Sequence, residues 1–265
     1  MHIAVCVKQV PNTTQVKINP ETNTLVRDGV ESIMNPFDEN ALEMALQLKE
    51  AHPGTRVTVV TMGPPQAEAV LREAVGRGAD DVLLLCDRAV AGSDTWATGY
   101  ALSCAVKKAG GADVVLFGKQ AIDGDTAQVG PGVADWLGMP CVTLARKVEI
   151  DEAAGKASVE RVFEDGWEKL EVPLPFAATV VKEANVPRMA SLRGKMAAKR
   201  MAIAPVTAAE CGADPEKLGL QASPTHVVGI FSPPQKTGGE KWEAGEDAEG
   251  AAAKLVAELK RRQLV

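Results

Sequence analysis

The chain has 265 residues, which suits one large α/β domain with an appendage and leaves too little for two full domains. Its 29 Lys and Arg residues against 35 Asp and Glu residues give a net charge of −6, which argues against a general nucleic-acid-binding protein. With five Phe, four Trp and one Tyr, aromatic stacking is not expected to dominate ligand binding.

No apolar run reaches the roughly 18 residues that a membrane-spanning helix needs, so no membrane span is expected. The first residues lack the basic head and long apolar body of a secretory signal. The five cysteines include no CxxC pair, and the three histidines have no Cys or carboxylate at ligand spacing, so no metal site is expected. This cysteine usage favours structural thiols and a cytoplasmic protein.

Short apolar runs alternate with helical patterns through the first half of the chain. The runs have the length of strands buried on both faces and lie at residues 2–7, 57–62, 81–86 and 113–118. Helices are predicted at residues 38–50, 65–77, 94–109 and 126–138. In the first helix, Asp38 is the expected N-cap, and one face carries Leu42, Ala45, Leu46 and Leu48. This alternation predicts a mostly parallel sheet with helices on both faces, whose ligands bind at the carboxyl ends of the strands.

The second half changes character. Strand-like segments separated by turns predict an antiparallel addition to the sheet; they lie at residues 141–150, 157–163 and 168–182. A basic segment follows at residues 183–205. Residues 232–249 are rich in Pro, Gly and charge, which is typical of a linker or arm, and residues 250–262 predict a final amphipathic helix.

The most informative stretch is FGKQAIDGDTAQVGP, at residues 117–131, because it follows a buried strand and enters a helix. Gly124 lies between Asp123 and Asp125, and it can adopt a positive φ and turn the chain sharply. Thr126 and Gln128 would then begin the helix, where free amides and the Thr126 hydroxyl could hold a phosphate. The alternative is an ordinary strand–helix turn with Asp125 as its N-cap. Neither GxGxxG nor a P-loop is present.

Other predicted strand ends should lie near this loop. Lys8 and Gln9 follow the first strand, and Lys8 could offset phosphate charge or could simply be exposed to solvent. Together the strand ends bring amides and small residues to one edge, which suits an adenine nucleotide. No GxSxG or HExxH motif is present, which fits a protein whose cofactor carries the chemistry.

Several segments together resemble the beta (small) subunit of electron transfer flavoprotein. They are VCVKQVP at 5–11, MNPF at 34–37, ALEMALQLKE at 41–50, GPPQAEAVLREAVGRGAD at 63–80, LFGKQAIDGDTAQVGP at 116–131 and NVPRMASLRGKMAAKR at 185–200. Their order and spacing cover roughly residues 1–235. The resemblance implies an electron-carrier subunit rather than an enzyme in its own right.

The resemblance also implies an organisation. A Rossmann-like nucleotide-binding domain would span residues 1–182, a partner-recognition loop and helix 183–205, and a C-terminal arm that wraps the alpha subunit 206–265. In that family the alpha subunit holds the main FAD, while beta holds AMP in plain carriers or a second FAD in electron-bifurcating members. The form DGDTAQVGP is similar to the bifurcating branch, so FAD is expected in beta, with AMP as the alternative. NADH would then deliver a hydride, and the electrons would pass separately to the alpha flavin and to a low-potential acceptor such as ferredoxin or flavodoxin.

Strand-end positions and the resemblance together give the expected cofactor-binding residues. They are Val7, Lys8, Asn35, Met62, Gly63, Asp94, Thr95, Gly118, Asp123, Gly124, Asp125, Thr126, Ala127, Gln128, Val129 and Gly130. No catalytic residue is assigned.

The resemblance places a docking element for acyl-CoA or other dehydrogenases in the basic segment. Leu192 matches the position of an anchoring leucine, and it lies among Arg188, Arg193 and Lys195. The alternative is a basic surface loop with Leu192 packed inward. Val186 stands where many family members carry Glu, so partner choice is expected to differ.

A second function class stays open at this point. A stand-alone adenine-nucleotide-binding or nucleotide-hydrolysing α/β protein would share the fold. It would want a glycine-rich phosphate motif near residues 100–130, and it would not need the basic segment or the arm at 232–265.

Overall fold

The structure is a computed structural model that describes residues 1–12, 17–19, 24–26, 31–229, 245 and 247–265. Two compact units divide the chain, residues 1–228 and 229–265, and each is described by itself. None of the helices within the described ranges is long and apolar enough to cross a membrane.

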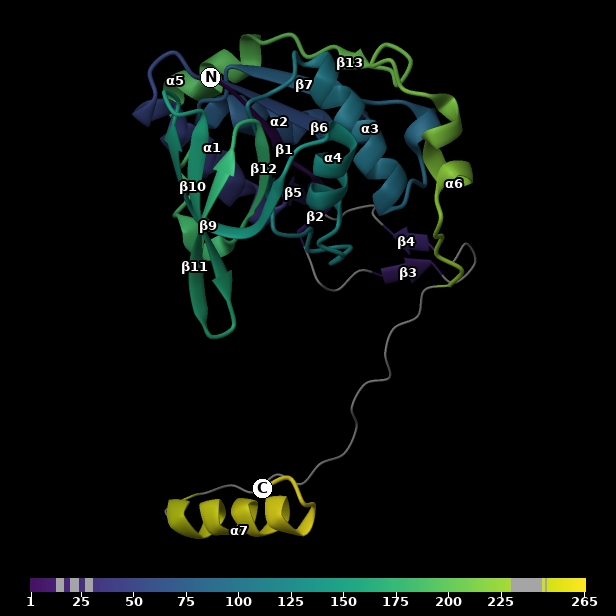
Figure 1. The fold of residues 1–265 in the computed structure, drawn as a ribbon. Helices are drawn as coiled ribbons and strands as arrows, with labels where there is room; N and C mark the ends of the chain where they lie inside the picture. Colours follow the sequence, from purple (N-terminus) through teal and green to yellow (C-terminus); the bar gives the residue numbers. More distant parts are fainter. Residues whose placement is uncertain (13–16, 20–23, 27–30, 230–244, 246) are drawn as a thin grey trace. The chain divides into compact units, whose positions relative to one another are not determined.

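A sheet of nine strands forms the centre of the first unit, in the order β11-β10-β9-β12-β8-β1-β6-β7-β13 (Figure 1). Its parallel part pairs β1 with β6 and β8, β6 with β7, β8 with β12, and β7 with β13. The strands of this part are β1 (His2–Cys6), β6 (Arg56–Met62), β7 (Asp81–Leu85), β8 (Val114–Gly118), β12 (Phe176–Val180) and β13 (Pro205–Val206). The four strands predicted in the first half are therefore confirmed, and so is the α/β fold with a mostly parallel sheet.

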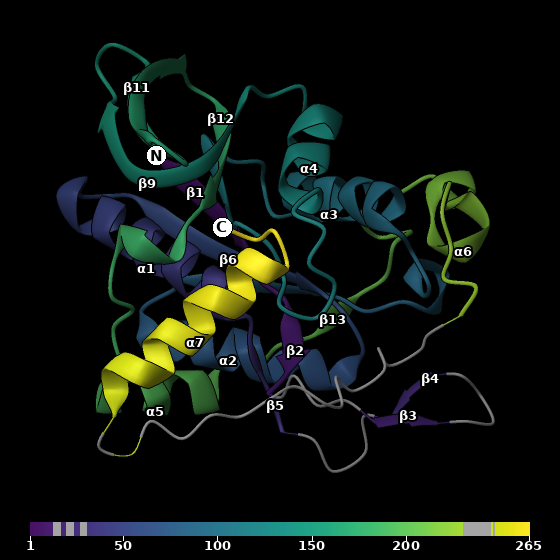
Figure 2. The same ribbon diagram turned by 90° about the horizontal axis from the view of Figure 1, so that it is seen from below.

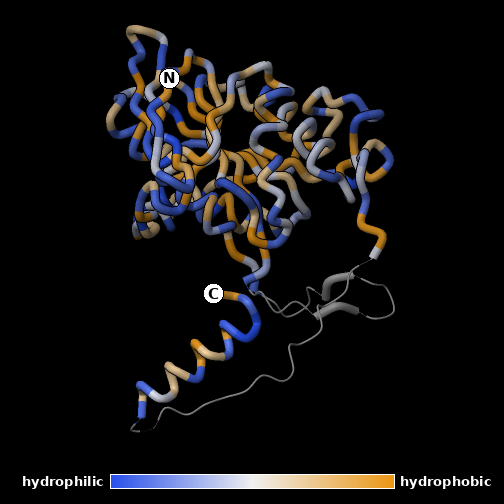
Figure 3. Tube along the Cα trace, turned by 60° about the horizontal axis from the view of Figure 1, so that its bottom comes forward, coloured by the Kyte–Doolittle hydropathy of each residue, from blue (hydrophilic) through white to orange (hydrophobic). Residues whose placement is uncertain are grey.

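Helices cover both faces of this sheet. They are α1 (Pro36–Ala51), α2 (Glu68–Arg77), α3 (Thr95–Lys108) and α4 (Val129–Leu137). Figure 2 shows α1 and α2 on one side of the sheet and α3 and α4 on the other. Each pair closes a separate core, and hydrophobic residues concentrate in this interior (Figure 3).

Alternate residues of β1 serve the two cores. Ile3 and Val5 pack with α1 and α2, whereas Ala4 and Cys6 pack with α3 and α4. Because both faces are covered, a polar alternation would place polar groups in a core, and this explains the uninterrupted apolar runs of the sequence.

The first helix begins earlier than predicted. Pro36 occupies the first turn of α1 and Asn35 is its N-cap, so the prediction of Asp38 as N-cap is wrong. Asp38 lies inside the helix, where its carboxylate accepts hydrogen bonds from the amide of Lys8, which follows β1, and from the amide of Gly118, which ends β8. The predicted apolar face is confirmed, because its four residues Leu42, Ala45, Leu46 and Leu48 are buried.

The antiparallel addition consists of β9 (Cys141–Asp151), β10 (Lys156–Phe163) and β11 (Gly166–Pro173). The strand-like segment predicted at 168–182 is in fact two strands. It breaks at Leu174–Pro175, where proline lacks an N–H for the ladder, and β12 then enters the parallel part between β9 and β8. Pattern alone does not separate these strands, although β11 alternates polar and apolar residues and is mostly exposed, whereas β12 is mostly apolar and fully buried.

Several short strands and helices are not predicted from the sequence. Strand β2 (Gln9–Pro11) pairs with β5 (Ser32–Met34), and β3 (Lys17–Asn19) pairs with β4 (Thr24–Val26). These three-residue strands are shorter than the window over which a period can be read. The remaining helices are the 3₁₀ turns η1 (Pro65–Ala67), η2 (Arg88–Val90), η3 (Lys182–Ala184) and η4 (Pro215–Lys217), with α5 (Leu192–Arg200) and α6 (Gly219–Ala222).

The second unit contains one described helix, α7 (Ala248–Arg261), close to the predicted range 250–262. The Asp247 side chain caps it by accepting a hydrogen bond from the Gly250 amide at 2.8 Å. The linker predicted at 232–249 lies mostly outside the described residues.

Candidate functional site

The carboxyl ends of β1 and β8 are joined by one buried carboxylate. Asp38 on α1 accepts hydrogen bonds from the Lys8 amide at 2.7 Å and from the Gly118 amide at 3.1 Å. Asp38 is 6% exposed. Asp38 thus fixes the spacing of the two strand ends from which predicted site residues extend. Sequence reasoning missed this role, because a carboxylate in the first turn of a helix has an ordinary explanation in the helix dipole.

Burial raises the pKa of Asp38 to about 7, although the hydrogen bonds it accepts and the nearby Lys8 charge favour its ionised form. The folded protein therefore binds this proton more readily than the unfolded chain does. Stability contributed by Asp38 is present at low pH and is lost as the pH rises toward the folded pKa.

We expect this proton to be visible in the comparison of wild type with Asp38→Asn. The wild type should gain about 1–3 kcal/mol relative to the variant when the pH falls from 8 to 5. Urea unfolding of both proteins at the two pH values measures the effect, and other titrating groups cancel in the comparison. An equal difference in the free energy of unfolding at pH 5 and pH 8 would contradict the assignment.

Asn35 holds the loop at residues 119–128. Its side-chain amide donates to the Gln120 carbonyl at 2.8 Å, and its side-chain oxygen accepts from the Ile122 amide at 3.2 Å. The residue is 1% exposed, and its own amide donates to the Lys8 carbonyl at 2.9 Å. Asn35, which is predicted to bind cofactor, therefore orients the loop through these buried hydrogen bonds.

The loop turns differently from the prediction. Asp125 and Ala127 adopt left-handed conformations, each with φ of 54°, whereas Gly124 is not among the residues with positive φ. The prediction that Gly124 makes the sharp turn is therefore wrong. Asp125 can occupy this region because its carboxylate accepts a hydrogen bond from the Gln120 side chain and its amide donates to the Ala121 carbonyl at 2.9 Å.

Helix α4 begins at Val129, later than the predicted start at residue 126. Gln128 is the N-cap, so the alternative with Asp125 as N-cap is wrong, and Thr126 lies exposed in the loop. No side chain caps this helix. The Gln128 side chain instead accepts a hydrogen bond from the Thr95 hydroxyl at 3.0 Å.

Lys8 reaches across to the same loop. Its ammonium lies 2.7 Å and 2.8 Å from the two carboxylate oxygens of Asp123. The Lys8 side chain is 49% exposed, and the Asp123 side chain is 20% exposed. This pair brings one positive charge to the loop and offsets one of its two aspartates.

Glycines keep the backbone close at two predicted positions. A Cβ on Gly118 would lie 2.6 Å from the Phe37 carbonyl carbon and 2.7 Å from the Asp38 nitrogen. A Cβ on Gly130 would lie 2.6 Å from the Thr179 methyl carbon. Gly124, by contrast, has nothing within 4 Å of such an atom.

The other predicted residues contribute in different ways. The Val7 side chain is buried in the core. The Val7 carbonyl accepts a hydrogen bond from the Thr61 hydroxyl at 2.7 Å. Met62 is half-buried, and Gly63 donates its amide to the Leu85 carbonyl at 3.0 Å. Asp94 is the N-cap of α3 and accepts from the Trp96 and Ala97 amides at 3.0 Å and 3.1 Å. The structure therefore brings together Lys8, Asn35, Gly118 and residues 123–130. Thr95 is linked to this group by its hydrogen bond to the Gln128 side chain.

This arrangement suits a phosphate group. The first amides of α4 have no side-chain cap, and the positive end of the helix dipole lies there. Thr126 is exposed in the loop that precedes the helix, and Lys8 supplies a cation. No cluster of three or more His, Cys, Asp or Glu side chains that could hold a metal occurs within the described ranges.

A second candidate surface lies at residues 186–196. Leu192 is 79% exposed at the start of α5, so the alternative in which it packs inward is wrong. Met189 and Val186 are also exposed, at 89% and 87%. The Ser191 side chain caps α5 by accepting from the Gly194 amide at 2.9 Å.

Internal contacts fix this surface to the domain. Arg188 donates to the buried Glu43 from its Nε at 2.8 Å and from its Nη2 at 3.0 Å, and it also pairs with Glu50. Asn40 on α1 donates to the Asn185 carbonyl at 2.9 Å. Arg188 is therefore an anchor of the segment, whereas Arg193 and Lys195 are exposed.

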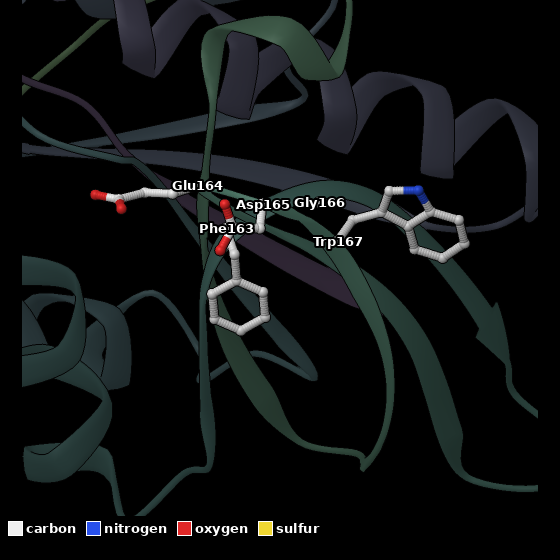
Figure 4. A pocket seen from close by; sticks show the side chains of 5 residues that line it. All are labelled: Phe163, Glu164, Asp165, Gly166 and Trp167. Atoms are coloured by element: carbon white, nitrogen blue, oxygen red, sulfur yellow. The ribbon is translucent and has the colours of Figure 1, made fainter.

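A shallow hollow of about 600 Å³ lies at the turn between β10 and β11, lined by Phe163, Glu164, Asp165, Gly166 and Trp167 (Figure 4). Arg161 stacks over the Phe163 ring at 4.7 Å, and Arg146 stacks over the Trp167 ring at 4.6 Å. None of the predicted site residues lines this hollow.

Comparisons with known proteins agree with the resemblance found in the sequence. The family model described as electron transfer flavoprotein domain matches residues 22–211. The chain is 50% identical over 265 residues to the caffeyl-CoA reductase-Etf complex subunit CarD of Acetobacterium woodii, with 100% of both chains covered. It is 48% identical over 264 residues to the electron transfer flavoprotein subunit beta of Megasphaera elsdenii, with 97% of each covered. It is 46% identical over 270 residues to the protein FixA of Azorhizobium caulinodans, covering 99% of this chain and 95% of the relative.

Proposed function

The chain belongs to the electron transfer flavoprotein family as a beta-type subunit, and on this basis we propose that it pairs with an alpha subunit in an electron-bifurcating heterodimer. The observation that carries its nucleotide site is the uncapped start of α4, which directly follows the loop DGDTAQ. Full-length similarity to a subunit whose name places it in a caffeyl-CoA reductase-Etf complex supports the same branch.

We propose that beta holds FAD at the carboxyl edge of the sheet. The amides of Val129 and Gly130 and the Thr126 hydroxyl would bind the phosphates. Lys8 would leave Asp123 to offset their charge, and Asn35 and Asp38 would keep the loop and the strand ends in place. In such a geometry, backbone amides would bind the nucleotide phosphates, which fits the lack of a glycine-rich fingerprint in the sequence.

A bound FAD would supply hydride acceptance from NADH and the release of electrons one at a time. The chain itself would bind and orient the cofactor, and its family membership makes it an electron carrier rather than an enzyme in its own right. Ferredoxin or flavodoxin would be the low-potential acceptor in the bifurcating form. AMP in place of FAD would make it a plain carrier with one flavin in alpha.

The nucleotide content of the purified heterodimer tests this proposal. We expect two FAD per heterodimer after denaturation and chromatographic separation of the released nucleotides. One FAD with one AMP would overturn bifurcation and leave the nucleotide site standing. One FAD without any further nucleotide would overturn the site itself.

We also propose that the surface around Leu192 docks partner dehydrogenases. An exposed apolar side chain can enter a pocket on the partner, while the exposed cations Arg193 and Lys195 speed encounter with an acidic surface. The anchors Arg188 and Asn185 would hold the segment ready for contact, so little order would have to be gained on binding.

Replacing Leu192 with Ala is expected to lower the second-order rate of electron transfer with a partner dehydrogenase by about tenfold, because an apolar anchor contributes on the order of 1.4 kcal/mol. Stopped-flow mixing of the heterodimer with the reduced dehydrogenase measures this rate. Leu192→Met is the matched control, since it keeps the apolar volume and should keep most of the rate. Equal rates for Leu192→Ala and wild type would show that docking occurs elsewhere.

A further inference from the structure

The Asp94 carboxylate joins two segments that lie far apart in the chain. One of its oxygens accepts from the Trp96 and Ala97 amides and so caps α3. The other oxygen accepts from the Thr225 amide at 3.0 Å and from the Thr225 hydroxyl at 2.8 Å. A carboxylate with four donors around it uses nearly all of its accepting capacity, so little remains for a ligand.

Further hydrogen bonds tie the same two segments together. The Asp94 amide donates to the Ser223 hydroxyl at 2.8 Å, and that hydroxyl donates to the Gly219 carbonyl at 2.8 Å. The Leu220 amide donates to the Ala91 carbonyl at 3.2 Å. These bonds form a clasp, defined here as Asp94 with Ser223 and Thr225. Val227 and Val228 come shortly after it and are 77% and 88% exposed, so the clasp lies just before the boundary of this unit at residue 228.

The clasp continues into the candidate nucleotide site through the next residue. The Thr95 hydroxyl donates to the Gln128 side chain at 3.0 Å, and Gln128 is the N-cap of α4. Only one hydrogen bond and the Asp94–Thr95 peptide therefore separate the clasp from the uncapped amides of Val129 and Gly130.

The Asp94 charge makes the clasp strong. Burial alone would raise the pKa of Asp94, but the hydrogen bonds from Ala97, Thr225 and Trp96 hold it below its ordinary value. The side chain is therefore ionised at neutral pH, and its bonds to Thr225 are charge-assisted.

We propose that Asp94 is a positioning residue that couples nucleotide binding at the α4 loop to the root of the C-terminal segment at residues 219–228. This coupling rests on the proposed nucleotide site. A ligand bound to the first amides of α4 restricts the motion of Gln128, and the hydrogen bond between Thr95 and Gln128 transmits this restriction to the clasp. Nucleotide binding therefore makes local opening of residues 219–228 less frequent. Asp94 thus acts through its neighbours and does not itself hold the nucleotide.

Hydrogen exchange of the heterodimer tests the coupling. The beta nucleotide is removed, ADP is added as the probe, and exchange is followed by mass spectrometry in peptides covering residues 120–130 and 219–228. In the wild type, ADP should slow exchange at least threefold in both regions. In Ser223→Ala/Thr225→Val, protection of 120–130 should remain while the ADP-dependent protection of 219–228 disappears. The single variant Thr225→Ser keeps a hydroxyl at this position and leaves Ser223 unchanged, so it should keep the ADP-dependent protection of residues 219–228.

A matched control removes a similar bond from the same part of the chain. Thr207 donates its hydroxyl to Glu210 at 2.8 Å, and neither residue touches the clasp, so Thr207→Val should leave the coupling intact. Protection at 120–130 without protection at 219–228 in the wild type would overturn the coupling, as would protection at 219–228 that survives in the double variant. Lack of protection at 120–130 would instead overturn the nucleotide site on which the coupling rests.

Discussion

Replacing Gly118 with Ala is expected to release the beta nucleotide and to lower the free energy of unfolding by about 3 kcal/mol or more. The new Cβ would meet the backbone of Phe37 and Asp38 at 2.6 Å and 2.7 Å, and backbone cannot rotate away as a side chain can. The carboxyl end of β8 must therefore move from α1, which breaks the hydrogen bond between the Gly118 amide and Asp38.

Nucleotide content per heterodimer and urea unfolding measure these two effects separately. Gly124→Ala is the matched control, because Gly124 lies in the loop that follows β8, has nothing within 4 Å of an added Cβ and is not among the residues with positive φ. It should keep both nucleotide and stability. If Gly118→Ala retained its full nucleotide content, the proposed site would have to lie elsewhere in the heterodimer.

Replacing Arg188 with Ala is expected to lower the free energy of unfolding by about 3 kcal/mol, because it leaves a buried carboxylate without its cation. Glu43 is 6% exposed at its side chain and accepts two side-chain bonds from Arg188 as well as one from its backbone amide at 3.0 Å. Burial alone would raise the pKa of Glu43, but the bonds from Arg188 hold it below its ordinary value.

The pH dependence of this loss identifies its cause. Because the folded pKa of Glu43 is depressed, the ion pair stabilises the protein above the ordinary pKa of Glu and stops doing so as the pH falls. The difference between wild type and Arg188→Ala should therefore shrink below about pH 4. Glu43→Gln combined with Arg188→Ala should recover part of the stability, and Arg193→Ala, an exposed change in the same segment, should cost little. A loss in Arg188→Ala that did not depend on pH would point to lost packing instead.

The sequence predicts the parallel part of the fold well, because strands such as residues 2–7 and 113–118 are apolar on both faces and are separated by clear helical periods. It fails where tertiary contacts override local pattern. Asp38 has the position of a first-turn carboxylate, and only the fold brings the Lys8 and Gly118 amides to it. Local pattern likewise predicts one strand-like segment at 168–182, because only the pairing partners in the sheet distinguish β11 from β12.

The candidate site shows the same division. The position of the loop at the end of β8 follows from the sequence, because carboxyl ends of parallel strands share an edge. Its internal geometry does not, since glycine is the expected residue for a positive φ and the structure uses Asp125 and Ala127 instead. Arg188 is a further example. In the sequence it is one cation among several, and its partners Glu43 and Glu50 lie more than 130 positions earlier.

Strand β1 lies inside the sheet, but it precedes both of its neighbours in the chain. Among the strands of the nine-stranded sheet β1 is synthesised first, and its two neighbours are β6, ending at Met62, and β8, ending at Gly118. One edge of β1 therefore lacks its partner until Met62 has been made, and the other edge lacks its partner until Gly118 has been made. At about 5–20 residues per second, the second interval lasts several seconds or more. An apolar strand with a free edge is a template for intermolecular pairing, so nascent chains of this protein are expected to depend on chaperones until β8 emerges.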